Sequence, residues 1–371
     1  MNDASKPDTL ASLRDEIDAI DAEVLTLLNR RARVAQRVGE LKRATDEHAQ
    51  VFRPEREAQV VRRLGALNDG PLPDDAIATI YREIMSACRA LERSAVVAYL
   101  GPEGTYSEHA VILQFGRSVE RRPCATIDEI FREVEATSSD FGVIPVENST
   151  EGTVNRSLDM LLNSPLRICG EVALAIDHHL LTKSGSMRVD EADGDGRAVT
   201  RICAHPQALA QCIQWLDRHY PDIEKVPVAS NGMAAKMASE DATIAAIAGD
   251  LAIERYGLAA VASHIQDLAR NTTRFAVIGS IATTPSGRDQ TSIVFSVANK
   301  SGAVYEALEP LARHGVSMTR FESRPARTGV WVYHFYIDVE GHETDAGVAA
   351  ALGELKAQAG FFKILGSYPL A

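Results

Sequence analysis

The sequence predicts a multidomain protein with an all-α N-terminal domain of three helices, a central α/β domain and a C-terminal α+β domain of ferredoxin-like topology. Three observations lead to this prediction. Apolar residues recur every three or four positions from Leu10 to Leu41, as in a long amphipathic helix. From Ala95 onward, short apolar runs bounded by Gly and Pro alternate with helical stretches. Residues 291–369 then follow the order strand, helix, strand, strand, helix, strand.

The N-terminal domain is expected to contain three helices. The first carries the apolar seam, which is interrupted by the cation Arg31. Pro54 is suited to open the second helix because its fixed φ fits a first helical turn, and the Asn, Gly and Pro of residues 68–73 end it. Asp74 is expected to cap the third. Three helices of this kind have more apolar seam than they can bury among themselves, so we expect a homodimer.

Two cations of the first helix are candidate ligands for a small anion. Lys42 follows Arg31 by eleven residues, which is three helical turns, so the two lie on one face. With Arg14 nearer the start of the helix, these cations could receive a dianion. Alternatively, Arg31 extends from the edge of the seam to water while its stem covers apolar surface.

Composition restricts the classes of partner. The chain has 371 residues, 45% hydrophobic and 24% charged, without an apolar run long enough to span a bilayer. Its net charge of -12 disfavours nucleic acid as a partner. The first 21 residues lack the basic-then-apolar order of a signal peptide, and the five cysteines show no paired metal-ligand spacing. We therefore expect a cytoplasmic protein with small-molecule ligands, no metal and no membrane partner.

The central domain is predicted from apolar runs that alternate with helices, which indicates one or two lobes of sheet covered by helices. The expected strands are 96–101, 141–146, 168–176, 201–206, 243–249 and 274–282. The expected helices are 126–136, 207–220 and 232–240. Residues 184–197 are expected to form an exposed loop whose acidic residues do not make a calcium site, because Ile202 stands where the closing Glu should be.

A linker at residues 283–290 is expected to precede the last domain. The predicted strands there are 291–298, 317–325, 329–340 and 361–369, and the predicted helices are 302–315 and 347–360. The domain limits are thus 1–94, 95–282 and 290–371.

Three groups of motifs carry a resemblance to known families. The N-terminal region resembles the all-helical chorismate mutases in LR at 13–14, RR at 30–31, GELK ending at Lys42, PEREAQV at 54–60 and REIMSACRALE at 82–92. The middle resembles prephenate dehydratase in GPEGTYSEHA at 101–110, GVIPVENSTEGTV at 142–154, AHPQALAQC at 204–212, AAIAGDLAIERYGL at 245–258 and IQDLARNTTRF at 265–275. The end resembles ACT regulatory domains in SGAV at 301–304 and ESRP at 322–325. In this order they are similar to the bifunctional chorismate mutase–prephenate dehydratase family.

The resemblance implies an enzyme of phenylalanine biosynthesis that needs no cofactor. Chorismate would rearrange to prephenate, and prephenate would lose hydroxide and CO2 to give phenylpyruvate, with feedback inhibition by L-phenylalanine. The central domain would have two α/β lobes similar to periplasmic solute-binding folds.

For the mutase, the resemblance implies that catalysis involves Arg14, Arg31, Lys42, Glu57 and Glu92, and that Arg53, Arg56 and Cys88 contact substrate. Arg14, supplied by the partner protomer, and Arg31 would hold the two carboxylates of chorismate. Lys42 would donate to a carboxylate or the ether oxygen, and Glu57 would accept the substrate hydroxyl. Cys88 could instead be a small buried residue of its helix.

For the dehydratase, the resemblance implies that Thr273 is essential to dehydration. The substrate-contacting residues would be Thr105, Glu147, Asn148, Ser149, Gln207 and Arg274. A threonine hydroxyl is a poor acid alone, so it would pass on a proton through a polarised hydrogen bond. By type, His178, His179 and His205 are possible donors, or else solvated or capping residues.

For regulation, the resemblance implies a phenylalanine site at an ACT dimer interface. Its residues would be Gly302, Ala303, Val304, Ser317, Glu322, Ser323 and Arg324. The alternative is that Gly302 only caps a helix and that residues 322–324 form a surface strand.

Three rival functions stay open from sequence. The same scaffold could act on arogenate, which carries an amine where prephenate has a keto group. A non-catalytic amino-acid sensor could share the two-lobed fold, although Thr273, Asn148 and Gln207 together speak against it. A protein with mutase activity alone is the third.

Overall fold

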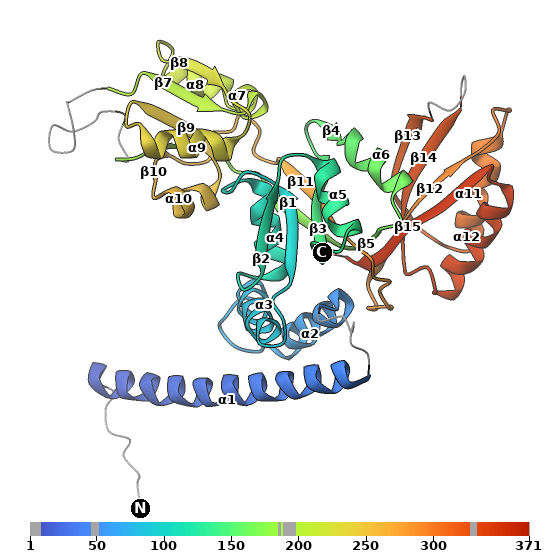
Figure 1. Cartoon of the computed structure of the whole chain (residues 1–371), viewed down its shortest axis with the longest axis horizontal. Coiled ribbons are helices and arrows are strands. Elements are labelled where there is room, and N and C mark those ends of the chain that lie inside the picture. Colours follow the sequence, from blue (N-terminus) through green and yellow to red (C-terminus); the bar gives the residue numbers. More distant parts are fainter. Residues whose placement is uncertain (1–8, 46–51, 185–186, 188–197, 327–331, 371) are drawn as a thin grey trace, which may run out of the picture.

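The computed structural model describes residues 9–45, 52–184, 187, 198–326 and 332–370, apart from the side chain of residue 43. Its parts form an elongated molecule in which α1 runs along one side and the C-terminal domain lies at one end (Figure 1). Most of the loop expected at 184–197 lies outside the described residues. None of the described helices is long and apolar enough to cross a membrane.

The N-terminal region contains three helices, α1 (Leu10–Thr45), α2 (Pro54–Leu67) and α3 (Asp74–Ala90). Pro54 occupies the first turn of α2, as predicted. The prediction that Asp74 caps α3 is wrong by one residue, because Pro73 is the cap and the helix begins at Asp74. The Asp74 carboxylate instead accepts a hydrogen bond of 2.8 Å from the Asn68 side-chain amide.

Helix α1 leaves its apolar seam largely uncovered in a single chain. The relative exposure of these side chains runs from 41% at Leu13 to 77% at Leu10, with Val24 at 46% and Leu27 at 61%. The helix contacts α3 and projects past it as one straight rod (Figure 1). Helix α1 thus has the sequence of a helix that packs in a core, but a single protomer buries only part of its apolar face.

The central region forms two lobes, as the resemblance implied. Lobe 1 is a sheet in the order β2-β1-β3-β11-β5, with β4 paired to β3. Its strands are β1 (Val96–Leu100), β2 (Glu120–Cys124), β3 (Phe141–Asn148), β4 (Gly152–Thr153), β5 (Arg167–Ala175) and β11 (Thr272–Gly279). Its helices are α4 (Tyr106–Phe115), α5 (Ile127–Glu135) and α6 (Asn155–Asn163).

Lobe 2 is a sheet in the order β10-β6-β9-β7-β8. Its strands are β6 (His179–Thr182), β7 (Arg201–Ala204), β8 (Glu224–Pro227), β9 (Ile244–Ala248) and β10 (Ala259–Ala262). Its helices are α7 (Pro206–Gln211), α8 (Ile213–His219), α9 (Asn231–Glu240) and α10 (Asp250–Tyr256). The single helix predicted at 207–220 is in fact two helices that meet at Cys212, whose φ of -116° and ψ of 7° depart from helical values.

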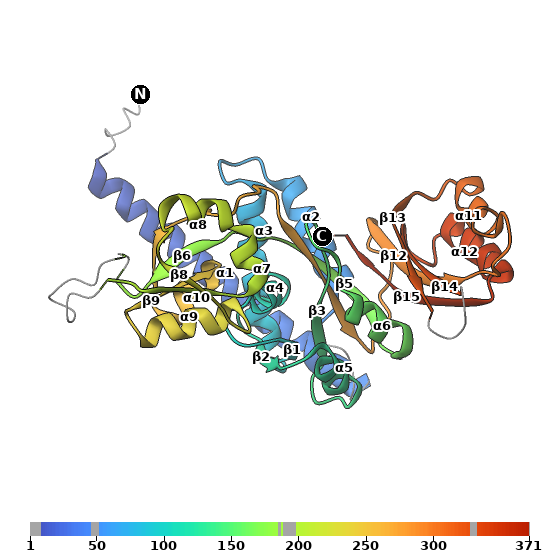
Figure 2. The same ribbon diagram turned by 90° about the horizontal axis from the view of Figure 1, so that it is seen from above.

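The C-terminal domain has the predicted βαββαβ order. It comprises β12 (Asp289–Ser296), α11 (Ala303–Arg313), β13 (Met318–Pro325), β14 (Tyr333–Glu340), α12 (Ala346–Gln358) and β15 (Phe361–Pro369), with sheet order β13-β14-β12-β15. Both views place lobe 1 between this domain and lobe 2 (Figures 1 and 2). Helices α11 and α12 cover one face of the sheet, and lobe 1 covers the other.

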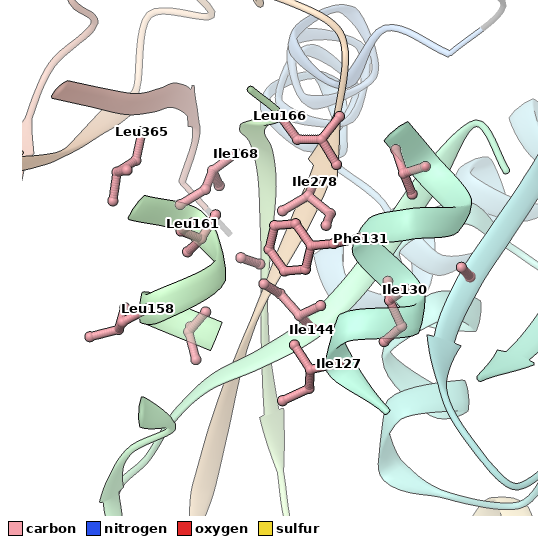
Figure 3. Packing of buried hydrophobic residues seen from close by; sticks show 14 of the residues in the cluster. Ile127, Ile130, Phe131, Ile144, Leu158, Leu161, Leu166, Ile168, Ile278 and Leu365 are labelled. Atoms are coloured by element: carbon pink, nitrogen blue, oxygen red, sulfur yellow. The ribbon is translucent and has the colours of Figure 1, made fainter. Parts of the chain in front are cut away.

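The contact between lobe 1 and the C-terminal domain is part of a shared hydrophobic core. Leu365 of β15 packs near Leu161 of α6 and Ile168 of β5 (Figure 3). At Gly366 the two backbones approach so closely that an added Cβ would lie 2.0 Å from the Ile168 carbonyl oxygen. Only glycine permits this approach.

The N-terminal helices also dock on lobe 1. Phe52, which precedes α2, is 2% exposed and its ring lies 4.6 Å from that of Phe115 and 5.3 Å from that of Phe141, measured between centroids. Gly116 ends α4 with a φ of 74°, and an added Cβ there would meet Ser86 of α3 at 2.4 Å. The predicted limit between the first two domains is thus a packed interface.

Candidate functional sites

A cavity of about 370 Å³ lies between the two lobes and collects most of the predicted dehydratase residues. Lobe 1 supplies Thr105, Asn148 and Thr273 to its wall, and lobe 2 supplies His205 and Gln207. The segments that cross between the lobes, after β5 and before β11, also line it. A ligand bound here would contact both lobes and the crossing segments.

Asn148 and Thr273 are fixed relative to each other by the sheet and by their side chains. They are register partners of β3 and β11, and Asn148 Nδ2 donates to Thr273 Oγ1 at 2.8 Å. The Asn148 side-chain oxygen accepts from the backbone N–H groups of Thr150 and Glu151 at 3.0 and 3.1 Å, which fixes the orientation of the amide. Because the Thr273 oxygen is the acceptor in this contact, its hydroxyl hydrogen is left to be donated to a ligand.

A chain of side-chain hydrogen bonds continues from Asn148 along the cavity. Asn148 Nδ2 also donates to Asn271 Oδ1 at 2.8 Å, and Asn271 Nδ2 donates to Gln211 Oε1 at 3.0 Å. The same Gln211 oxygen lies 2.9 Å from His178 Nε2, and His178 Nδ1 lies 2.9 Å from the Tyr106 hydroxyl. The chain therefore joins both lobes through buried groups.

This chain fixes the tautomer of His178. Gln211 Oε1 can only accept, so a proton is on His178 Nε2, and Nδ1 shares the single hydroxyl hydrogen of Tyr106 with the Asp177 carbonyl oxygen, which lies 2.6 Å from that hydroxyl. Burial lowers the pKa of His178, with a smaller opposing effect from its hydrogen bond to Gln211. At neutral pH the ring is thus an uncharged link in the chain.

Three other predicted residues have local structural roles, and two of them, Thr105 and His205, line the cavity. Thr105 caps α4, where its Oγ1 accepts from Glu108 N. Ser149 Oγ accepts from Thr272 N at 2.9 Å and thereby ties the loop after β3 to β11. His205 is the capping residue of α7, and its Nδ1 accepts from the backbone N–H of Gln207 at 3.3 Å.

Glu147 and Arg274 do not lie at the cavity, although we expected them to contact substrate. They neighbour Asn148 and Thr273 in sequence, and successive side chains of a strand point to opposite faces. Both therefore face the C-terminal domain, where Arg274 Nη2 lies 2.6 Å from Asp338 Oδ2. We had expected neighbouring residues of each motif to contact the substrate together. In a β-strand, however, alternate residues of the motif lie on opposite faces of the sheet.

The predicted mutase residues meet where α1 crosses α3. Arg31 Nη1 lies 3.0 Å from the Sγ of Cys88, which is buried. The Glu92 side chain packs against Gly39 of α1 so closely that an added Cβ at Gly39 would lie 2.5 Å from the carboxylate. Lys42 is half-buried one turn beyond Gly39 on α1.

Glu57 forms an ion pair with Arg89 that sequence analysis did not predict. Both side chains are largely buried, at 17% and 9% exposure. Burial raises the pKa of Glu57, and the nearby cations Arg89, Arg82 and Arg31 oppose this. Arg89 also lies over the ring of Phe52, 5.1 Å from its centroid, and donates to the carbonyl of Phe115, so it links the helical region to lobe 1.

The other predicted mutase cations are exposed in a single chain: Arg14, Arg53 and Arg56. Arg14 precedes Arg31 by 17 residues on the same continuous helix, which separates them by about 26 Å along its axis. One protomer therefore cannot bring Arg14 to the Arg31 site.

The predicted phenylalanine residues divide between the two faces of the C-terminal sheet. Gly302 is the N-cap of α11 and has a left-handed conformation, Ala303 and Val304 lie in the first turn of the helix, and Ser317 and Ser323 are exposed. Glu322 and Arg324 pair in register with Tyr336 and His334 and face lobe 1. There Arg324 Nη1 lies 2.7 Å from Asp159 Oδ1 of α6, so its guanidinium is occupied by lobe 1.

Several residues of these sites were missed in the sequence: Arg89, Tyr106, Gln211 and Asn271. All four lie within the motifs that carried the resemblance, which was the available signal. Their contacts join residues 26 to 123 positions apart, so only the fold brings them together.

Comparison with known proteins assigns a family model to each region. Chorismate mutase type II matches residues 13–93, prephenate dehydratase matches 97–283 and the ACT domain matches 291–357. A bifunctional chorismate mutase/prephenate dehydratase of Neisseria gonorrhoeae is 48% identical over 360 residues, covering 96% of both chains.

Two solved structures resemble the region outside the N-terminal helices. A prephenate dehydratase of Arthrobacter aurescens in complex with L-Phe is 33% identical, with a TM-score of 0.66, and the match covers 74% of this chain and 90% of that one. GqqA, described as a novel type of quorum quenching acylase, is 31% identical with a TM-score of 0.65 and coverage of 74% and 98%. The same scaffold is thus associated with more than one described activity.

Proposed function

The chain belongs to the bifunctional chorismate mutase/prephenate dehydratase family, and we propose that it converts chorismate to prephenate at its helices and prephenate to phenylpyruvate between its lobes. The observation that carries the proposal is the convergence of Asn148, Thr273 and Gln207 on one cavity in a chain that also bears the mutase helices. The division at residues 94/95 and 283–289 is part of the proposal and is supported by the matched ranges.

The mutase reaction is an intramolecular rearrangement, so the protein has to fold the substrate and stabilise charge that develops on the ether oxygen. Arg31 binds one carboxylate, and Lys42 donates to the other end of the substrate or to the ether oxygen. Glu57 accepts the substrate hydroxyl, with Arg89 favouring its ionised form. Cys88 lies beside the Arg31 guanidinium and contacts the substrate there.

The dehydratase reaction expels hydroxide and CO2 from prephenate, and formation of the aromatic ring drives the loss. Thr273 donates a hydrogen bond to the leaving hydroxyl and stabilises the negative charge that develops on it, since the threonine oxygen already accepts from Asn148. The hydrogen-bonded chain through Asn271, Gln211 and His178 holds this geometry across both lobes. Gln207, opposite on lobe 2, contacts a carboxylate of the substrate.

The assembly we propose is a cytoplasmic homodimer joined through α1. The exposed seam of α1 supports this, because a second copy of the helix would bury it and bring Arg14 to the partner's Arg31. The five cysteines are free and buried, which suits a reducing compartment.

An assay that starts from chorismate tests the function. The purified protein should release phenylpyruvate, and accumulation of prephenate alone would leave a mutase without dehydratase activity. Turnover of arogenate, measured beside prephenate, decides the substrate of the second site. A protein that binds phenylalanine without converting either compound would be a sensor.

Mixing two inactive variants tests the dimer. Arg14→Ala and Arg31→Ala should each lack mutase activity, but after exchange of subunits about a quarter of the wild-type activity should return, since half the dimers are mixed and each holds one intact site. An absence of recovery in a mixture shown by light scattering to contain dimers would place Arg14 outside the partner's site.

A further inference from the structure

Four charged residues connect the cavity strands to the C-terminal domain, and we call them the interdomain quartet: Glu147, Arg274, Arg320 and Asp338. Glu147 and Arg274 are register partners in lobe 1, and Arg320 and Asp338 are register partners in the C-terminal sheet. Each couple faces the other across the interface. Arg320 Nε lies 2.9 Å from Glu147 Oε2, and Arg274 Nη2 lies 2.6 Å from Asp338 Oδ2.

Glu147 and Arg274 of the quartet lie next to the cavity residues Asn148 and Thr273 in sequence, and their side chains are on the opposite face of the sheet. Glu147 precedes Asn148 and Arg274 follows Thr273, so a displacement of either charged side chain acts on a backbone that carries a cavity residue. A β-bulge separates these strand ends from the rest of the sheet, because Arg274 pairs with Glu147 whereas Phe275 pairs with Pro145. Beyond a bulge the regular ladder is interrupted, and side-chain contacts contribute more to the position of the strand end.

Glu147 is shared unequally between two arginines. Its Oε2 is hydrogen-bonding distance from Arg320 but 3.9 Å from Arg274 Nε. That Nε atom is buried and has no hydrogen-bond partner within the described part of the chain. A buried N–H without an acceptor is destabilising, so a second arrangement, in which Glu147 moves toward Arg274, has a physical basis.

Arg320, the partner of Glu147 in this structure, lies on β13 of the C-terminal domain. Arg320 shares a strand and a face with Glu322 and Arg324, while Ser323 points to the opposite face, toward Phe335. A ligand that moves β13 therefore changes the distance between Arg320 and Glu147. The Arg320 side chain is 11% exposed and that of Glu147 is 37% exposed, so the contact lies at the edge of the interface and is partly screened by water.

We infer that Glu147 is a positioning residue of the dehydratase whose carboxylate can pair with either Arg320 or Arg274. Phenylalanine bound to the C-terminal domain inhibits dehydration by changing the partner of Glu147 from Arg320 to Arg274. The inference rests on the proposed function. In this structure Glu147 is held by Arg320 across the interface. When β13 moves, Glu147 engages Arg274, and the change displaces Asn148 relative to Thr273.

The test removes the contact without removing either cavity residue. Arg320→Gln, Glu147→Gln and the double variant are compared with wild type in the full-length protein. Two quantities are measured: phenylalanine binding by calorimetry, and the ratio of dehydratase kcat/KM without and with saturating phenylalanine. Glu343→Gln is the matched control, because it breaks another contact of lobe 1 with the C-terminal domain, Arg167 Nη2 to Glu343 Oε1 at 2.6 Å, away from the cavity strands.

Arg320→Gln should bind phenylalanine within about two-fold of wild type while the inhibition ratio falls at least about five-fold, as expected when coupling but not binding is lost. The double variant should lose no more inhibition than Glu147→Gln alone, because that change already removes both contacts of Glu147. Glu343→Gln should behave as wild type in both measurements.

Two results would overturn the inference: an Arg320→Gln protein inhibited as strongly as wild type, or one that loses binding and inhibition together, which would show a structural role alone. Failure of the proposed function is separate, since it would appear in the wild-type protein as absent phenylpyruvate formation or absent inhibition.

Discussion

Replacement of Thr273 by alanine removes one hydroxyl from the cavity and should separate the two activities. Its oxygen accepts from Asn148 Nδ2 at 2.8 Å, and its hydrogen is available to the leaving group of prephenate. Loss of one such donor lowers kcat by about 10²–10³-fold, which corresponds to about 2.7–4 kcal/mol of activation free energy. Asn148 keeps its bond to Asn271, so the free energy of unfolding should fall by only about 0.5–1.5 kcal/mol.

The assay follows both reactions on one preparation of Thr273→Ala. Mutase activity should persist, because its helices hold Arg31 and Cys88 apart from the cavity. Thr273→Ser is the matched control, since it retains the hydroxyl and should keep much more dehydratase activity. Equal loss of both activities would indicate a folding defect or a shared site, and a dehydratase loss below about three-fold would refute a catalytic hydroxyl, given the effect expected of one donor.

Three further predictions concern regulation and the mutase. A chain ending at Ser286 loses the residues that the C-terminal domain supplies to the shared core and should be less stable, and the dehydratase activity that it keeps should not be inhibited by phenylalanine, because it lacks the ACT domain; inhibition at an unchanged concentration would place the effector site elsewhere. Glu92→Ala should lower mutase activity while Glu92→Gln keeps much more of it, since an amide can still donate a hydrogen bond to the ether oxygen; equal activity of Glu92→Ala and wild type, with dehydratase as internal control, would remove Glu92 from catalysis. Arg89→Met should move the acid limb of the mutase profile to higher pH, because burial raises the pKa of Glu57 and Arg89 is the main opposing charge; an unmoved limb would contradict ionised Glu57 as the hydroxyl acceptor.

The domain order and most elements could be predicted because they depend on local periods. The seam of α1 follows from a spacing of three to four, and the C-terminal sheet follows from a short sequence of alternating runs. The break at Cys212 could not be predicted, because it is a local backbone departure within a continuous apolar pattern.

For the sites, the sequence identified the residues of the motifs but not their partners from distant parts of the chain. Motifs identified Asn148 and Thr273, which the sheet places in register. The faces of Glu147 and Arg274 follow from strand alternation, but their partners on the C-terminal domain do not, because the contact with Asp338 spans 64 positions. The same limit applies to Arg89 and Glu57, whose pairing depends on how two helices dock.

The placement of Phe52 has a consequence for how the chain can be divided. This ring belongs by sequence to the helical region but by packing to the aromatic core of lobe 1, between Phe115 and Phe141. A dehydratase fragment that starts at residue 95 would leave that core with a void, at a cost of about 3–5 kcal/mol on the scale of Phe truncations. The two catalytic units are therefore separable in chemistry but coupled in stability, and removal of the Phe52 ring should lower the melting temperature of lobe 1.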